Sequence, residues 1–188
     1  MERGDVTKDK IEKAALHLFL RKGVDGTSMR DVVHKAGYSL GAFYNHYASK
    51  EDLAWTLFSG AWYTMGVELR RRIRAEDGLR NQLLAIASYM FGFFDENPDL
   101  VGYAFLARHR YIWKVNVRLP NPHIVVRLFI TIAMSHGEAR KMDAEIATQI
   151  VMGVVIQAID AKILNLIKGP LKARADPVAD ALYRMLKA

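Results

Sequence analysis

The residues between 28 and 50 carry side chains that suit the binding of phosphate groups. Ser28 and Ser39 stand where helices are expected to begin, so each hydroxyl can cap a helix or donate a hydrogen bond to a phosphate. Lys50 stands at the start of a later helix, where its ammonium group and the free backbone N–H groups favour an anion. These residues indicate non-covalent binding of a polyanion. The alternative is that the serines only cap helices and that Lys50 is a solvated surface charge.

Catalytic patterns are not apparent elsewhere. The sequence has no phosphate-cradling glycine loop and no His-Glu-x-x-His segment, and we expect no nucleophile elbow of the Gly-x-Ser-x-Gly type. None of the 6 histidines lies four residues from another, and there is no cysteine. We therefore expect no catalytic residues, no metal site and no cofactor, and the chain is not expected to be an enzyme.

Composition limits the remaining classes of protein. The chain has 188 residues, of which 51% are hydrophobic, and that is enough apolar material for a folded core. Every uncharged stretch, such as 81–94 and 146–159, is shorter than the ~18–20 apolar residues of a membrane span. The net charge of +7 favours a polyanionic partner. We expect a soluble, cytoplasmic protein with no membrane association.

The spacing of apolar residues predicts three short helices at the N-terminal end. An apolar stripe runs through 7–22, and Ser28 with Asp31 three residues later forms a capping-box pattern that begins a second helix. Gly37 ends that helix after about eight residues, and a third helix is expected from Ser39 to Tyr47. Two short helices joined by a glycine-containing turn predict a helix-turn-helix, whose second helix enters the major groove of DNA.

The rest of the chain also reads as helix. A helix capped by Ser49 has the buried stripe Phe58, Ala61, Trp62, Met65, Leu69 and Ile73, and further helices are expected at 79–95, 99–113, 123–136, 143–168 and 176–186. Asp176 is expected to cap the last helix. The predicted fold is all-α with about nine helices. We expect a DNA-binding domain at 1–50 and a helical ligand-binding and dimerisation domain at 51–188.

Two segments carry a family resemblance. Residues 36–47 (Ala-Gly-Tyr-Ser-Leu-Gly-Ala-Phe-Tyr-Asn-His-Tyr) and 49–53 (Ser-Lys-Glu-Asp-Leu) closely resemble the signature of the TetR family of bacterial transcriptional regulators. Two positions depart from the signature. Tyr38 stands where a small aliphatic residue is usual, and Leu40 stands where a polar base-reading residue is common.

The resemblance implies a set of DNA-binding residues. Apolar contacts to base edges are expected from the first turn of the recognition helix, and Arg30 and Asn45 are candidates for reading guanine and adenine. Tyr44 and His46 match phosphate-contacting positions of the family. The complete predicted set is Ser28, Arg30, Ser39, Leu40, Gly41, Ala42, Tyr44, Asn45, His46 and Lys50.

The resemblance further implies a core that binds a small, mostly apolar effector. Candidate ligand-binding residues are Trp62, Met65, Tyr89, Phe93, Tyr103, His109, Phe129 and Gln157. For any one of them ordinary core packing is the alternative interpretation. The arginines between 70 and 74 could attract an anionic group or be a solvated helix end. The last two helices are expected to form a homodimer, because the helix at 143–168 is apolar on nearly every side.

These expectations define a ligand-responsive regulator. We expect a repressor that binds a palindromic double-stranded operator as a homodimer and that an apolar small molecule releases. Promotion of binding by the ligand stays open. The alternative function is a helical interaction or adaptor protein with a degenerate DNA-binding head.

Overall fold

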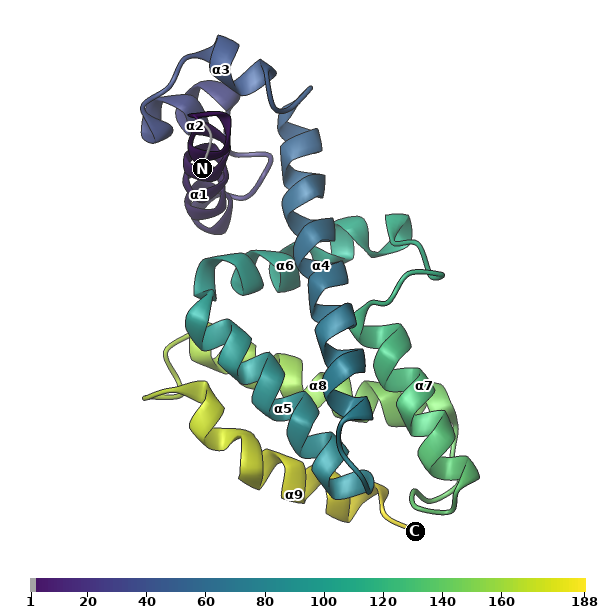
Figure 1. Ribbon diagram of the computed structural model, residues 1–188. Coiled ribbons are helices and arrows are strands. Elements are labelled where there is room, and N and C mark those ends of the chain that lie inside the picture. Colours follow the sequence, from purple (N-terminus) through teal and green to yellow (C-terminus); the bar gives the residue numbers. More distant parts are fainter. Residues whose placement is uncertain (1–2) are drawn as a thin grey trace. The chain divides into compact units, whose positions relative to one another are not determined.

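The computed structural model describes residues 3–188, which form nine α-helices and two short 3-10 helices (Figure 1). The helices are α1 (Arg3–Lys22), α2 (Met29–Ala36), α3 (Leu40–Tyr44), α4 (Lys50–Arg74), α5 (Leu79–Glu96), α6 (Pro98–Tyr111), η1 (Ile112–Lys114), α7 (Pro122–Ser135), α8 (Ala144–Ile163), η2 (Leu171–Arg174) and α9 (Ala175–Leu186). The only β-type pairing within 3–188 is an isolated bridge between Ala139 and Lys187. The all-α class predicted from hydrophobic periodicity is confirmed.

The chain packs into two compact units. Unit 1 contains residues 3–61 and 99–115, and unit 2 contains residues 62–98 and 116–188. Helix α4 begins in unit 1 and ends in unit 2 without interruption. These packing units differ from the division at residue 50 made from the sequence. That division concerns function and stays a prediction.

Unit 1 is held together by apolar side chains from α1, α2, α3 and the start of α4. Ile11, Val32, Phe43 and Phe58 are fully buried there, as the amphipathic spacing predicts. Helix α6 joins this unit because the Tyr103 hydroxyl donates a hydrogen bond of 2.9 Å to a backbone carbonyl of α4. The first turns of α4 are thereby fixed to α6 within unit 1.

In unit 2, α5 lies along η2 and α9, as Figure 1 shows. The Asp95 carboxylate accepts hydrogen bonds of 2.9 Å from two backbone N–H groups of η2. At the other end of α5, the Arg80 guanidinium donates to Asp176 at 2.9 Å and to Asp180 at 2.8 Å. The prediction that Asp176 caps α9 is therefore wrong. The 3-10 turn η2 continues directly into α9 and leaves Arg174 as the cap residue, without a side-chain cap.

A close approach of backbones fixes the loop that precedes α7. A Cβ atom built on Gly66 of α4 would lie 2.3 Å from the Asn121 Cα atom and 2.4 Å from the Pro120 carbonyl carbon. Asn121 is buried, and its side-chain oxygen accepts a hydrogen bond of 3.1 Å from the backbone N–H of Ile124. Gly66 thus lets the residue that caps α7 lie directly against α4.

Two predicted helices are shorter than expected. Helix α3 ends at Tyr44 instead of Tyr47, and α8 ends at Ile163 instead of residue 168. After α8 the backbone turns at Asn165, which has a φ of 59°. The Lys162 ammonium donates to the carbonyl of Gly169 at 2.7 Å and so satisfies an acceptor in the segment after the helix. A lysine near the end of a helix thus stabilises the turn instead of extending the helix.

Helix α8 is the one described helix that is long and apolar enough to cross a membrane by length and composition alone. A third of its 18-residue apolar window is buried against the rest of the protein. The sequence argument from uninterrupted uncharged runs did not select this helix, because Asp160 and Lys162 lie near its end. A single helix of this kind is weak evidence for a membrane span, since core helices of soluble proteins have the same composition.

Candidate nucleic-acid interface

The turn between α2 and α3 has the geometry of a helix-turn-helix. Gly37 adopts the left-handed conformation with φ 73° and ψ 35°, which is open to glycine because it has no Cβ. Its N–H donates to the carbonyl of His34, and the next N–H, of Tyr38, donates to the carbonyl of Val33 at 2.9 Å. This pair of hydrogen bonds is a Schellman motif, which ends α2 and redirects the chain into α3.

Serine side chains cap the helices that the sequence analysis expected them to cap. Ser28 and Asp31 form the predicted capping box, with hydrogen bonds of 3.0 and 3.1 Å. Ser39 Oγ accepts from the backbone N–H of Ala42 at 3.2 Å, and Ser49 Oγ accepts from that of Asp52 at 3.0 Å. A capping hydroxyl accepts a hydrogen bond and keeps its own proton. Capping and donation to a phosphate are therefore compatible.

None of the ten residues predicted to bind DNA is buried. The exposed members are Ser28, Arg30, Ser39, Gly41, Tyr44 and Asn45, and the half-buried members are Leu40, Ala42, His46 and Lys50. Tyr44 exposes 53% of its surface, whereas its neighbour Phe43 is fully buried. The alternation follows from the short helix α3, which buries one face against α1 and α2 and presents the other to solvent.

The departure from the family signature at Tyr38 is accommodated at the edge of α1. The ring is half-buried, and the Lys10 ammonium lies 5.8 Å from its centroid. That arrangement is a cation–π contact. The larger side chain therefore occupies a peripheral position and does not enter the apolar core beneath α2 and α3.

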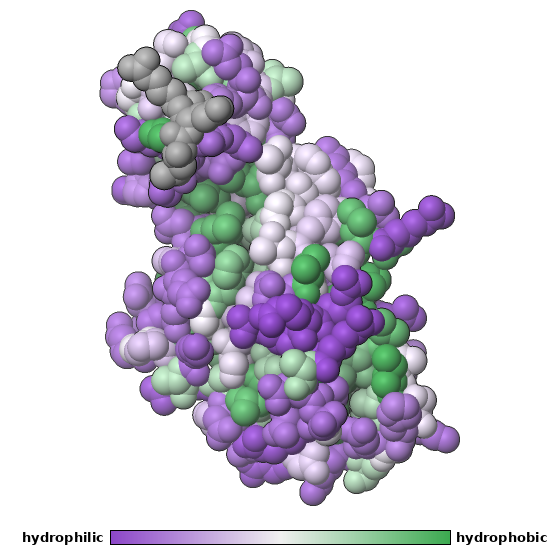
Figure 2. All heavy atoms as spheres, viewed as in Figure 1, coloured by the Kyte–Doolittle hydropathy of each residue, from purple (hydrophilic) through white to green (hydrophobic). Residues whose placement is uncertain are grey.

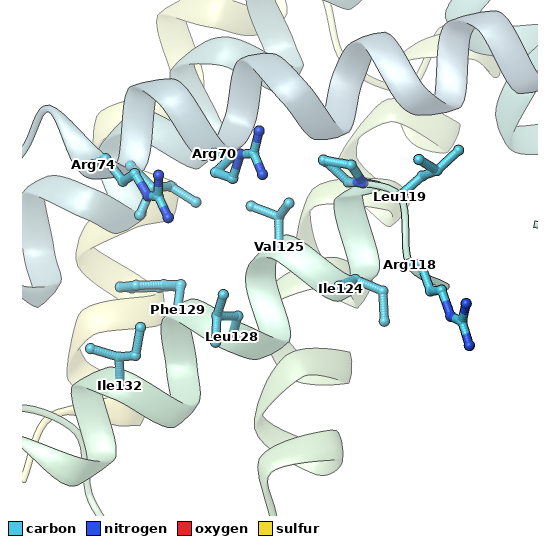
Figure 3. Close-up of a pocket in the computed structure, with 11 residues that line it drawn as sticks. Arg70, Arg74, Arg118, Leu119, Ile124, Val125, Leu128, Phe129 and Ile132 are labelled. Atoms are coloured by element: carbon cyan, nitrogen blue, oxygen red, sulfur yellow. The ribbon is translucent and has the colours of Figure 1, made fainter. Parts of the chain in front are cut away.

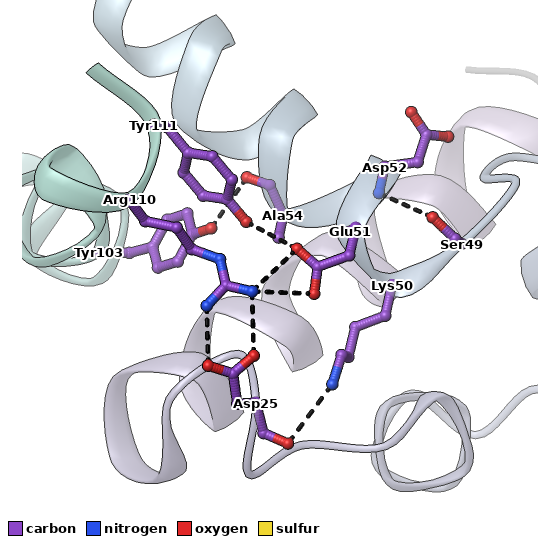
Figure 4. A network of polar contacts seen from close by, with 9 residues as sticks. All are labelled: Asp25, Ser49, Lys50, Glu51, Asp52, Ala54, Tyr103, Arg110 and Tyr111. Carbon is purple, nitrogen blue, oxygen red and sulfur yellow. Dashed lines mark hydrogen bonds and ion pairs between the residues drawn. The ribbon is translucent and has the colours of Figure 1, made fainter. Parts of the chain in front are cut away.

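Lys50 is surrounded by charged groups that sequence reasoning did not connect (Figure 4). Its ammonium lies 3.5 Å from the backbone carbonyl of Asp25, in the loop between α1 and α2. Arg110 of α6 donates to both carboxylate oxygens of Asp25, at 2.8 and 3.0 Å, and to Glu51 at 3.3 Å. Tyr111 donates to the same Glu51 carboxylate at 3.2 Å. Arg110 thus pairs with two acidic side chains that lie beside Lys50.

The electrostatics of this cluster agree with its geometry. Hydrogen bonding to the Arg110 guanidinium lowers the pKa of Asp25 below its usual range, and the same bond raises the pKa of Arg110. Burial raises the pKa of Tyr111, with the negative charge of Glu51 acting in the same direction. At neutral pH the cluster therefore holds an ionised Asp25 carboxylate, an arginine cation and a neutral Tyr111 phenol.

Residues 37–41 read Gly-Tyr-Ser-Leu-Gly, which is the spacing of a hydrolase nucleophile elbow. The expectation that the sequence has no Gly-x-Ser-x-Gly segment was therefore wrong. A nucleophile elbow joins a strand to a helix, whereas Ser39 here lies between two helices and caps the second. Within the described residues no histidine forms a hydrogen bond with Ser39. The segment is part of the helix-turn-helix.

The eight residues predicted to bind a ligand fall in both units. Tyr103 and His109 belong to unit 1, where the Tyr103 hydroxyl is bonded to α4 and His109 is exposed. In unit 2, Trp62 and Met65 are buried, Gln157 is exposed, and Tyr89 and Phe93 stack with ring centroids 5.7 Å apart. Phe129 is the member of the set that lines the groove between α4 and α7.

That groove lies entirely within unit 2 and has a volume of about 170 Å³ (Figure 3). Its apolar walls come from α7 and from Ile73 of α4, and three arginine side chains are placed around it. The groove is lined by both charged and apolar residues, among them Arg70, Arg74, Arg118, Val125, Leu128 and Phe129. Sequence reasoning identified the arginine cluster and Phe129 separately but did not bring them together.

The N-terminal part of the chain matches a known family of bacterial regulators. Residues 11–54 match the family model described as "Bacterial regulatory proteins, tetR family", which covers the helix-turn-helix and the start of α4. A Bacillus subtilis protein named as the uncharacterized HTH-type transcriptional regulator YerO is 35% identical over 72 residues, which are 38% of this chain and 24% of that protein. The regulator YdgC from the same organism, also named as uncharacterized, is 25% identical over 98% of this chain and 95% of its own.

Solved structures share the whole fold. A TetR family transcription regulator from Marinobacter aquaeolei VT8 superposes with a TM-score of 0.80 at 16% identity, covering 98% of this chain and 97% of its own. The transcriptional regulator FadR from Bacillus subtilis, solved in complex with stearoyl-CoA, has a TM-score of 0.70 at 19% identity, covering 93% of this chain and 97% of its own. Residues 11–54 therefore carry the signature of the TetR family of bacterial regulatory proteins, and the whole chain has the fold of TetR family regulators.

Proposed function

We propose that this regulator is a repressor that binds a palindromic operator as a homodimer through the ten residues of the helix-turn-helix set. The observation that carries the proposal is that none of these ten residues is buried and that they lie around a turn held by a Schellman motif. In a helix-turn-helix of this kind the second helix enters the major groove, and a two-fold dimer requires a palindromic site. A protein with this role works where the bacterial DNA is, and the role therefore supports a cytoplasmic location.

Lys50 provides the test of the DNA-binding mode. Lys50→Ala should weaken binding to operator and to random duplex by similar factors, because a phosphate contact positions the protein without reading sequence. The slope of log K against log salt should fall by about 0.9 per lost contact, hence by about 2 for a dimer. Fluorescence anisotropy at several salt concentrations measures both.

A matched variant controls for the loss of charge alone. Lys141→Ala removes the same charge from an exposed turn in unit 2, and its salt slope should stay at the wild-type value. An unchanged slope in Lys50→Ala would remove Lys50 from the proposed interface. Absence of salt-dependent binding by the wild type would favour the adaptor alternative instead.

The proposed dimer uses α8 and α9. Helix α8 leaves Ile146 55% exposed, and Gly153 on the same side has open space around it. An apolar helix face of this kind is stabilised when a second copy covers it. Leu182 of α9 would be a poor site for a test, because it is fully buried in its own protomer and a charge there would disrupt the core.

Ile146→Glu places the charge on the proposed interface itself. It should yield monomers at micromolar concentration in sedimentation velocity and reduce operator affinity. Leu106→Glu, a comparable change on the exposed side of α6, should leave the dimer intact. A wild-type protein that sediments as a monomer at micromolar concentration would contradict the dimer.

We also propose that a mostly apolar small molecule releases the operator. The groove between α4 and α7 supports this, because its walls are apolar and α4 runs from the groove to Lys50. FadR from Bacillus subtilis, which has the same fold, was solved with stearoyl-CoA. A ligand shifts the equilibrium between two states only by the difference in its affinity for them, typically ~1–3 kcal/mol.

A further inference from the structure

The arginines near the end of α4 divide into two groups. Arg71 and Arg72 pair with Glu68, at 2.9 and 3.6 Å, and Arg72 also lies over the Tyr89 ring at 4.9 Å. Arg70 and Arg74 lie one helical turn apart and line the groove between α4 and α7. Within residues 3–188 neither of these two guanidinium groups forms an ion pair or a hydrogen bond with another side chain.

A third arginine comes from a different element. Arg118 lies in the segment between η1 and α7 and lines the same groove, and its guanidinium also has no ion pair within the described chain. No acidic residue lines the groove. Glu145 of α8 is held by His123 at 2.7 Å and by Arg127 at 3.5 Å, both on α7. Two positive charges, on Arg70 and Arg74, therefore lie at this groove without a neutralising partner, whereas the Arg118 guanidinium points away from them in Figure 3.

The floor between these charges is apolar. Val125 and Phe129 are buried there, and Leu128 and Ile132 remain 52% and 46% exposed although both are large and apolar. Figure 2 shows hydrophilic residues over the C-terminal part of α4 beside hydrophobic residues over α7. A groove of about 170 Å³ is smaller than the roughly 300–1,000 Å³ of an enclosed ligand pocket, so it suits a single narrow chain.

We propose that this groove binds a single-chain amphiphile with an anionic head, a carboxylate or a phosphate monoester. Arg70 and Arg74 bind the head through charge-assisted hydrogen bonds, and Leu128, Phe129 and Ile132 contact the alkyl chain. This inference rests on the proposed function, because it specifies the effector as an anionic amphiphile and places its head at the end of α4. It also assigns a role to the Arg70–Arg74 cluster.

Ligands with one chain and different heads test the proposal on the full-length protein. Isothermal titration calorimetry is run with decanoate and decyltrimethylammonium below their micelle-forming concentrations, and with decanol below its solubility limit. Decanoate should bind about ten-fold tighter than decanol, and the cation should bind weakest. Equal affinities for decanoate and decanol would overturn the proposal, because the arginines would then contribute nothing.

Neighbouring arginines supply matched variants. Arg70→Gln should weaken decanoate binding by about five- to ten-fold and leave decanol binding unchanged, because Arg70 is exposed and its replacement preserves the fold. Arg71→Gln, one residue further on but outside the groove, should change neither. Leu128→Ser should weaken decanoate and decanol by a similar factor. An Arg70→Gln variant that keeps the wild-type ratio of the two affinities would refute the assignment.

Two further measurements exclude other occupants. Flotation with vesicles of anionic phospholipid separates a dispersed amphiphile from a membrane surface, and binding to vesicles without binding to decanoate would overturn the proposal. So would a change in sedimentation of Arg70→Gln without a change in decanoate affinity, because the groove would then be an interface between copies. Operator binding is measured separately. A wild-type protein that binds operator but does not prefer decanoate to decanol would refute this inference alone. A wild-type protein that prefers decanoate but does not bind operator would refute the proposed function.

Discussion

Two glycines on α4 predict opposite effects of the same substitution. A methyl group on Gly60 would have no neighbour within 4 Å, whereas one on Gly66 would lie 2.3–2.4 Å from backbone atoms of Pro120 and Asn121. Carbon atoms attract one another best at about 3.5–4.0 Å, so the loop must retreat by more than about 1 Å in Gly66→Ala. Backbone atoms retreat only when the whole segment moves.

The magnitudes follow from three contributions. Replacing glycine by alanine inside a helix stabilises the protein by about 0.5–1 kcal/mol at either position. At Gly66, overpacking costs about 1–3 kcal/mol, and loosening the Asn121 cap of α7 costs about 1 kcal/mol. Gly60→Ala should therefore be more stable than the wild type by up to about 1 kcal/mol, and Gly66→Ala less stable by about 1–3 kcal/mol.

Thermal unfolding at one protein concentration checks the pair. For a chain of this length 1 kcal/mol corresponds to roughly 2–4 °C in Tm. The Tm of Gly60→Ala should rise by about 1–4 °C, and that of Gly66→Ala should fall by about 2–12 °C. Gly66→Ala with a Tm equal to that of Gly60→Ala would refute the close approach of the loop to α4, and with it the position of one wall of the groove.

Three other substitutions test contacts within unit 1. Tyr103→Phe removes the buried hydrogen bond to the Ala54 carbonyl and should cost about 1 kcal/mol in urea unfolding. Ser39→Ala removes the side-chain cap of α3 and should lower the free energy of unfolding by about 1 kcal/mol. An unchanged urea midpoint would mean that the cap does not stabilise the protein. Arg110→Gln should raise the pKa of Asp25 toward its ordinary value of 3.8, as followed by carboxyl NMR titration. Because the folded pKa of Asp25 is lowered, this ion pair stabilises the wild type above about pH 4, and the contribution is lost as pH falls through the folded pKa.

Contacts between residues close in sequence were predicted well. The capping box of Ser28 and Asp31 and the end of α2 at Gly37 depend on residues three or four positions apart, and both appear as expected. The buried stripe of α4 likewise follows from helical periodicity alone. Local hydrogen bonding and amphipathicity are sufficient for these features because they involve one helix and its immediate flanks.

Contacts between distant residues were not predictable in the same way. Arg110 is 85 residues from Asp25 and 59 from Glu51, and nothing in its own helix indicates either partner. Asp176 has the residue type of a helix cap, yet Arg80, 96 residues earlier, takes its carboxylate. In each case a long-range ion pair competes with the local role, and the sequence alone does not show which prevails.

Because α4 is one uninterrupted helix, an insertion or deletion within it changes the orientation of every later side chain of the helix. Its 25 residues span about 37 Å at 1.5 Å per residue, with Lys50 in the first turn and Arg74 in the last. Inserting one residue in the middle would turn every later side chain by about 100° and carry Arg70 and Gly66 away from the α7 side, whereas an insertion of seven would restore the facing to within about 20°. Single-residue insertions and deletions in α4 should therefore not be tolerated, because its register sets which side chains face α7.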